Sequence, residues 1–339
     1  APLPTTQVVA VTAGGAASAL VTYSAPSGLD LCIDGAYITQ SVQTWAGTVP
    51  LVADRNALLR VFVRATQANS AQPSVRVRFY NGSTLLSTTV VPAPSASVPT
   101  IIDEATLNSS WNVTLAGASL QPGLKMLIDV DPTGAVAETD EADNSWPVSG
   151  TPAPLDVRTV STLMVRFVPV TQSANGLTGN VDITNKDSFL APMLKMFPLS
   201  TIDADIRDPF TTSAPVLASS GTNWSQVLGE LLALRIAEAS GRYYYGVVKT
   251  TYTSGVAGLG YISTPAAMGW DYLPSGTEVM AHELGHNFGR YHAPCGGPSG
   301  VDPFFPYSGG IIGTFGYDIV AGQIKFPILR DLMSYCDPH

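Results

Sequence analysis

Charge, histidine and cysteine are scarce in this sequence, and it has no long apolar run. Charged residues make up only 13% of its 339 residues, and the net charge is −9. An acidic chain of this kind is not expected to bind nucleic acid or an anionic membrane surface. No apolar stretch approaches the ~20 residues that a membrane-spanning helix requires. The sequence therefore predicts neither a nucleic-acid partner nor a membrane span.

Cysteine is too rare to supply a framework of disulfides. Cys32, Cys295 and Cys336 are the three cysteines, and the sequence alone does not fix which two of them pair. The chain also begins at Ala1, without a methionine or an apolar signal-like segment. We expect a processed or trimmed chain from which any targeting peptide has been removed.

Glycine and proline are abundant instead, with 31 and 26 residues, and 45% of the chain is hydrophobic. This composition is typical of a turn-rich globular protein with much β-structure, and it excludes disorder. The length is sufficient for two domains, each with its own core. Residues 1–25 are small and polar, and we expect them to form an extended lead-in.

Alternating apolar and polar residues predict a series of short strands in the first half. The clearest runs are Leu58–Arg64, Val75–Tyr80, Ser83–Val91, Trp111–Leu115 and Leu124–Val130. Asn81-Gly82 separates two of these runs and is a strong hairpin signal. The pattern predicts an all-β domain over residues 1–150, a sandwich that resembles immunoglobulin or fibronectin-type modules.

The pattern changes after a Pro-rich stretch, which predicts a linker over residues 151–156. Strands and helices then alternate, which predicts an α/β (α+β) domain over residues 157–339. We expect strands at Thr159–Val170, Ile202–Ile206 and Tyr243–Thr251. We expect helices over 187–197, from about residue 223 to 240, and from Ser275 to about Phe288.

Three of the four histidines fall in one short window, spaced as H-E-x-x-H-x-x-G-x-x-H. On a helix, His282 and His286 lie one turn apart on the same face and can reach one metal ion. Glu283 can hold a water molecule beside that ion and take its proton. Gly289 can adopt a positive φ, so the helix can end there and the chain can return His292 as a third ligand. Three protein ligands leave one position open, as in a catalytic zinc site.

This window resembles the zinc signature of the metzincin metallopeptidases and matches it at every defined position. The resemblance covers about residues 157–339 and is most specific at the zinc helix. It implies a methionine turn beneath the zinc, for which Met333 is in the expected place. It also implies a role for Tyr335, which matches a tyrosine that binds zinc or the oxyanion in astacin-like and serralysin-like members.

The resemblance further implies an edge strand before the zinc helix, with which an extended substrate pairs by β-augmentation. Residues 256–263 are the candidate, and Gly258, Leu259, Gly260 and Tyr261 form its centre. Glycine weakens a strand but allows another backbone to approach closely. A flexible loop is the alternative interpretation of this glycine-rich stretch.

The expected methionine turn also bears on the cysteines. If the zinc lies between His292 and Met333, Cys295 and Cys336 flank the same small volume. Their pairing would clamp the third-ligand turn against the methionine turn. A disulfide there indicates an oxidising compartment, and hence a secreted protein.

Two further features allow more than one interpretation. An acidic stretch from Asp129 to Asn144 offers oxygen ligands for calcium, but it lacks a fixed ligand spacing, so a solvated turn is the expectation. Cys32 resembles a latency cysteine only in being upstream of the zinc helix, since its surroundings do not match the cysteine-switch motif. A small buried side chain is the alternative role for Cys32.

These observations predict a secreted, monomeric zinc endopeptidase that hydrolyses proteins or glycoproteins, with Glu283 as general base. Two alternatives remain open at this stage. In one, the N-terminal domain holds the enzyme in a latent form. In the other, the protein is an adhesion or binding protein with an inactive peptidase domain.

Overall fold

The computed structural model describes residues 28–339, so the predicted lead-in over residues 1–25 lies outside the described residues. Within the described part, the chain forms several separate β-sheets and three α-helices. No helix in that part is long and apolar enough to cross a membrane. The predicted β-rich character is confirmed.

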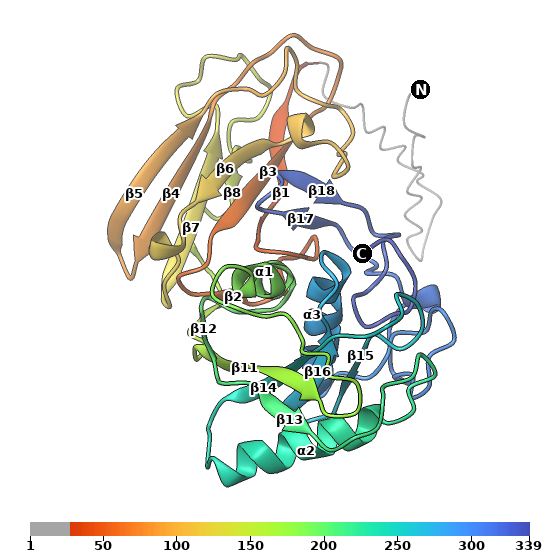
Figure 1. The fold of residues 1–339 in the computed structure, drawn as a ribbon. Coiled ribbons are helices and arrows are strands. Elements are labelled where there is room, and N and C mark those ends of the chain that lie inside the picture. Colours follow the sequence, from red (N-terminus) through yellow and green to blue (C-terminus); the bar gives the residue numbers. More distant parts are fainter. Residues whose placement is uncertain (1–27) are drawn as a thin grey trace, which may run out of the picture.

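Two antiparallel sheets form the first half of the described chain and share one apolar core (Figure 1). The smaller sheet contains β1 (Leu31–Thr39), β3 (Ala57–Ala65) and β6 (Trp111–Leu115). The larger contains β5 (Thr84–Val91), β4 (Val75–Asn81), β7 (Leu124–Val130) and β8 (Ser145–Trp146). Alternate residues of β4 are buried in the shared core, because successive side chains of a strand point to opposite faces. The 3-10 helices η1 (Leu107–Ser109) and η2 (Gly117–Ser119) flank β6.

A six-stranded sheet organises the second half, with β12-β11-β14-β16-β15 as its main strand order. Its strands are β11 (Leu163–Gln172), β12 (Ile202–Ile206), β13 (Phe210–Thr212), β14 (Tyr243–Val248), β15 (Gly258–Gly260) and β16 (Ala266–Trp270). All pairings are parallel except that of β15, which runs antiparallel to β16. One edge of the sheet is therefore the short strand β15.

Three helices cover the two faces of this sheet (Figure 1). They are α1 (Lys186–Met196), α2 (Trp224–Ala237) and α3 (Ser275–Asn287). Tyr244 and Tyr245 of β14 point to opposite faces, so Tyr245 packs in the core with α1 and α3, and Tyr244 packs in the core with α2. The three predicted helices are confirmed apart from their ends. The strand predicted over 256–263 is shorter than expected, and Tyr261 lies just beyond it.

The predicted linker over residues 151–156 is paired with the first half of the chain. β9 (Ala153–Pro154) pairs with β7, and β10 (Val157–Arg158) pairs in parallel with β2 (Leu51–Val52). Val157 is buried in the core of the first half. The hairpin of β17 (Gly316–Asp318) and β18 (Gln323–Lys325) also reaches back, because Tyr317 N donates to Ser41 O at 2.6 Å. The two halves are therefore connected by backbone pairing at several points.

Arg55 fastens the first half to the end of α1. Its guanidinium donates to Lys195 O at 2.7 Å, to Phe197 O at 2.6 Å and to Gln40 O at 3.0 Å. Lys195 and Phe197 carry carbonyl groups at the helix C-terminus, where a cation is favourable. Burial lowers the pKa of Arg55 to about 10, so the side chain remains charged at neutral pH.

Arg55→Met is expected to lower the free energy of unfolding by about 2–4 kcal/mol, because it leaves buried carbonyl groups without a donor. Urea denaturation followed by tryptophan fluorescence measures the change. Arg158→Met is the matched control, because Arg158 pairs with Asp156 at the surface, with side chains 63% and 53% exposed. The control should change stability by less than about 1 kcal/mol. Equal effects of the two variants would contradict a fastening role for Arg55.

Candidate metal centre

The helix α3 presents two histidines from one of its faces. His282 and His286 are four residues apart, and their ring centroids lie 5.0 Å from each other. The opposite side of the helix carries Met280, Ala281 and Leu284, which are buried against the six-stranded sheet. This apolar contact fixes the rotation of the helix, and therefore the direction of both imidazoles.

A glycine ends α3 and turns the chain back toward the histidines. Gly289 has φ 86°, a value that favours glycine. Gly289 N donates to His286 O at 2.8 Å and Arg290 N donates to Gly285 O at 3.0 Å, the hydrogen-bond pattern of a Schellman cap. The next residues bring His292 back, and its ring centroid lies 4.6 Å from that of His286.

Ring nitrogens of the three histidines converge on one point. His282, His286 and His292 each offer a ligand atom, and these atoms lie within 4.8 Å of one another. Each Nδ1 lies against a backbone carbonyl: His282 against Leu332 O at 2.8 Å, His286 against Arg290 O at 2.7 Å and His292 against Ser299 O at 2.6 Å. A carbonyl accepts only, so Nδ1 carries the proton and Nε2 keeps its lone pair.

The resulting tautomers suit a metal ion. The Nε2 atoms of His286 and His292 lie 3.1 Å apart, and in these tautomers neither carries a proton that could bridge them. Two lone pairs facing each other repel unless a cation lies between them. Two zinc-bound nitrogens at about 2.05 Å and a tetrahedral angle would lie about 3.3 Å apart. The donor set therefore fits a tetrahedral divalent cation such as zinc.

Burial favours the neutral, metal-binding form of His282 and His286. Desolvation lowers the pKa of His282 to about 4, although the carbonyl of Leu332 opposes the shift. Burial also lowers the pKa of His286. Because a protonated imidazole cannot ligate, a lowered pKa reduces the competition between protons and a metal at neutral pH.

Glu283, the residue after His282, is buried against the edge strand. Its residue is 8% exposed, and burial raises the pKa of its carboxyl to about 8. A Cβ atom added at Gly258 would lie 2.6 Å from Glu283 Oε1, and one added at Gly260 would lie 2.5 Å from Glu283 O. The two glycines are therefore needed for the close approach of β15 to α3. A cation on the histidines would favour the carboxylate form of Glu283.

Met333 packs against α3, the helix that carries two of the candidate ligands. A Cβ atom added at Gly285 would lie 2.5 Å from Met333 Sδ, so glycine at 285 leaves the space that the methionine fills. Ala293 N donates to Met333 O at 2.9 Å, which ties the segment after the third histidine to this turn. Leu332, the preceding residue, supplies the carbonyl that orients His282.

Tyr335 reaches the same group of rings from the other side of the turn. Its ring centroid lies 4.8 Å from that of His292 and 5.9 Å from that of His282. The residue is 59% exposed, so its phenol lies on the open side of the histidines. Partial burial, reinforced by the charge of Glu283, raises the pKa of this phenol. It therefore stays protonated and can donate a hydrogen bond.

The predicted disulfide between Cys295 and Cys336 is confirmed. The bond closes a loop across 41 positions of sequence. Tyr335 N donates to Cys295 O at 3.0 Å beside it. The disulfide thus joins the segment that follows His292 to the one that carries Met333 and Tyr335.

Replacing both cysteines by serine is expected to lower the free energy of unfolding by about 3–4 kcal/mol, because the unfolded chain gains conformational entropy. Zinc affinity should fall as well, since His292 loses part of its support. Denaturation in the presence of chelator and competitive zinc titration measure the two effects separately. Cys32→Ser is the matched control, because that thiol is free. A double variant with unchanged zinc affinity would show that the disulfide stabilises the fold without supporting the ligand.

Other side chains singled out in the sequence lie elsewhere. The Cys32 thiol is on β1, 3.4 Å from Asp34 Oδ1, and burial raises its pKa to about 11. In the acidic stretch, Asn144 Nδ2 donates to Glu138 Oε1 at 2.9 Å and to Glu141 Oε2 at 3.0 Å. Among the described residues, only the three histidines bring ligand atoms together closely enough for a metal ion.

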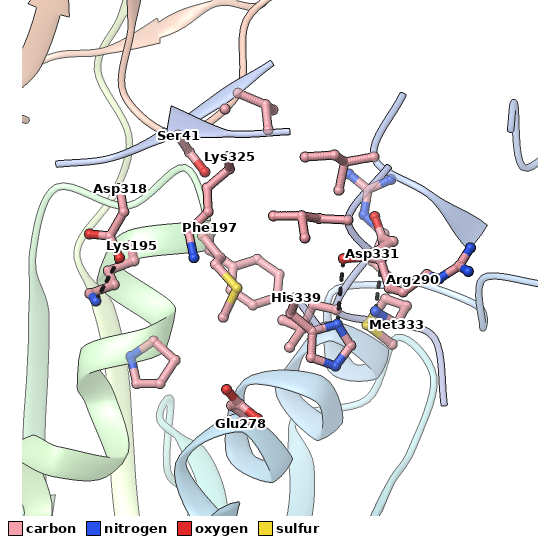
Figure 2. A pocket seen from close by; sticks show the side chains of 18 of the residues that line it. Ser41, Lys195, Phe197, Glu278, Arg290, Asp318, Lys325, Asp331, Met333 and His339 are labelled. Carbon is pink, nitrogen blue, oxygen red and sulfur yellow. Dashed lines mark hydrogen bonds and ion pairs between the residues drawn. The ribbon is translucent and has the colours of Figure 1, made fainter. Parts of the chain in front are cut away.

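A cavity of about 690 Å³ lies behind the methionine turn, at the junction of the two halves. Figure 2 shows Lys195 paired with Asp318 on one side and Met333 on the other. Its lining also includes Ser41 of the first half and Glu278 of α3. None of the three histidines is among the described residues that line this cavity. The cavity therefore adjoins the candidate metal centre through Arg290, Leu332 and Met333 but does not contain the candidate ligands.

Several contributors to the site were not anticipated from the sequence. They are the carbonyl groups of Leu332, Arg290 and Ser299, each of which holds one imidazole. Carbonyl groups leave no sequence signal. Asn287, which lies next to the site, does leave one, because it is a polar residue directly after a candidate ligand.

Searches against protein-family models and against curated proteins return no match for this chain. The assignment of a function therefore depends on the geometry of the histidine cluster and its surroundings.

Proposed function

We propose that this protein is a secreted zinc-dependent endopeptidase of the metzincin type, preceded by an immunoglobulin-like β-sandwich. The observation that carries the proposal is the arrangement of His282, His286 and His292, with each Nδ1 held by a carbonyl and Glu283 adjoining them. Three imidazole ligands, together with one carboxylate that is not a ligand, are the side chains that a hydrolytic zinc site requires.

Zinc bound by the three histidines would act as a Lewis acid that polarises the scissile carbonyl and acidifies the attacking water. The protein supplies the remaining parts. Glu283 takes the proton of the water as it attacks and passes it to the leaving amine. Its burial excludes bulk solvent, so the proton moves between Glu283 and the reacting groups.

In this proposal, Tyr335 and the edge strand β15 bind the substrate. The phenol of Tyr335 lies on the open side of the histidines and donates a hydrogen bond to the developing oxyanion. β15 lies at an edge of its sheet, so an extended polypeptide can pair with it. A protein or glycoprotein in an extended conformation is the substrate class that this arrangement fits.

Digestion assays on the full chain test the proposal. We expect the zinc-loaded protein to cleave casein or mucin, with new peptide N-termini identified by mass spectrometry. A chelator should abolish cleavage, and added zinc should restore it. Intact substrates after incubation with a chain that holds one zinc ion would contradict the proposal. That result would favour a latent form or an inactive peptidase domain.

A further inference from the structure

Asn287, the last residue of α3, connects the zinc helix to the edge strand. It is 4% exposed. Its Nδ2 donates to the carbonyl of Tyr261, the residue after β15, at 2.8 Å and to that of Ala266, the first residue of β16, at 3.0 Å. Because both partners are acceptors, the amide nitrogen must face them, which fixes the orientation of the carboxamide.

Backbone contacts strengthen this connection. Ser263 N, in the same turn between β15 and β16, donates to His286 O at 2.9 Å. The turn is thus fastened to the last two residues of α3, and one of these residues is a candidate zinc ligand. Tyr261 N also donates to Ala266 O at 3.2 Å, which extends the pairing of the two strands beyond β15.

The direction in which the backbone groups of β15 point determines how the contact made by Asn287 affects a bound substrate. Trp270 N donates to Ala257 O and Tyr261 N to Ala266 O, so residues 257 and 261 direct their backbone groups toward β16. Because successive residues of a strand direct their N–H and C=O groups to opposite sides, those of Leu259 also point toward β16. Those of Gly258 and Gly260 point toward the open edge of the sheet. These are the two glycines that pack against Glu283.

β15 packs closely against Glu283, with no space between them for an additional side-chain atom on either glycine. Cβ atoms at Gly258 or Gly260 would lie 2.5–2.6 Å from atoms of Glu283. A small movement of the turn between β15 and β16 would therefore shift the edge groups relative to the general base. In catalysis, misplacement of a bound substrate by about 1 Å can cost about 100-fold in rate.

Asn287 is not the residue that stability alone would favour at this position. Its Oδ1 is buried without a hydrogen-bond partner among the described residues. A buried acceptor without a donor opposes folding, whereas an apolar side chain carries no such penalty. The carboxamide is instead suited to holding two carbonyl groups at fixed positions.

We propose that Asn287 is a positioning residue that sets the distance between the edge strand β15 and Glu283. It thereby determines how strongly the protein prefers long, extended substrates. The inference rests on the proposed peptidase function. Asn287 acts through the carbonyls of Tyr261 and Ala266 and does not touch the substrate. Short substrates that do not reach β15 are unaffected by this contact.

Kinetics on a series of peptides of increasing length test the proposal. In the wild-type protein, kcat/KM should rise once the peptide is long enough to pair with β15. In Asn287→Ala, we expect that gain to fall at least about 10-fold, mainly through KM, with zinc content and turnover of the shortest peptide unchanged. An equal loss at every length would identify Asn287 as a residue of stability only.

Asn112→Ala is the matched control. Asn112 Nδ2 also donates to two carbonyls, Leu107 O and Ser110 O, each at 2.8 Å, but it lies in the first half of the chain. The Asn112→Ala variant should leave the dependence of kcat/KM on peptide length unchanged. Asn287→Ser, which retains a small donor, is used if the alanine variant does not fold, and an intermediate loss is expected.

Hydrogen exchange of the backbone amides separates this inference from the peptidase function. In Asn287→Ala, the amides of Tyr261 and Ser263 should exchange at least about 10-fold faster than in the wild-type protein, while amides of β1 stay unchanged. Unchanged exchange at Tyr261 and Ser263 would overturn the fastening role. If the wild-type protein cleaves no peptide, the peptidase function fails, and exchange still decides whether Asn287 holds the strand.

Discussion

Glu283→Gln is expected to abolish peptide hydrolysis while zinc remains bound. The substitution keeps the size of the side chain but removes the group that takes the proton from water. General acid–base groups contribute about 10²–10⁴-fold to rates, and we expect a loss of about 10³-fold or more in kcat. Cleavage of a fluorogenic peptide and zinc analysis of the same preparation measure the two quantities together.

The matched control for Glu283→Gln is Glu278→Gln, which makes the same change five residues earlier in the same helix. Glu278 is exposed and lies in the first turn of α3. The control should retain activity and lose at most a few tenths of a kcal/mol of helix stabilisation. Full activity of Glu283→Gln with bound zinc would remove Glu283 from the mechanism.

His286→Ala is expected to prevent zinc binding at ordinary protein concentrations, and with it activity. His286 is the most buried of the three candidate ligands, so no water readily replaces its nitrogen. Loss of only the group that hydrogen-bonds to a ligating imidazole typically lowers metal affinity by about 10–100-fold. Loss of the ligand itself should therefore lower it by at least about 100-fold. Competitive titration with a chromophoric chelator measures the affinity.

His339→Ala is the control for ligand loss, because His339 is the one remaining histidine of the chain. Its Nε2 lies 3.6 Å from Asp337 Oδ1, and it is not part of the histidine cluster. This variant should bind one zinc ion with wild-type affinity. If His286→Ala also binds zinc with wild-type affinity, the metal site lies elsewhere.

The parts of the site that could be predicted from the sequence depend on local spacing. Two histidines four residues apart share a helix face whatever the rest of the chain does. Gly289 at the helix end, with its positive φ, follows from the same local geometry. The strands of the first half could be predicted for a similar reason, because alternation with a period of two is a local property.

Other features could not be predicted, because they join segments that are distant in the sequence. Leu332 O orients His282 from 50 residues away. Arg55 binds the end of α1 from 142 residues before Phe197, and nothing in the sequence near Arg55 indicates that contact. The Pro-rich composition of residues 151–156 predicts a linker but not that β9 within it pairs with β7.

The sequence by itself determined the identities and order of the candidate ligands, the candidate general base and the turn that returns the third histidine. Only the tertiary structure decided the tautomers of the imidazoles, the cysteine pairing and the distance between the edge strand and Glu283. The physical reason is that spacing along one helix sets which side chains share a face. Carbonyls, glycines and cysteines from other segments act only after packing has brought them together, and the packing depends on the whole chain.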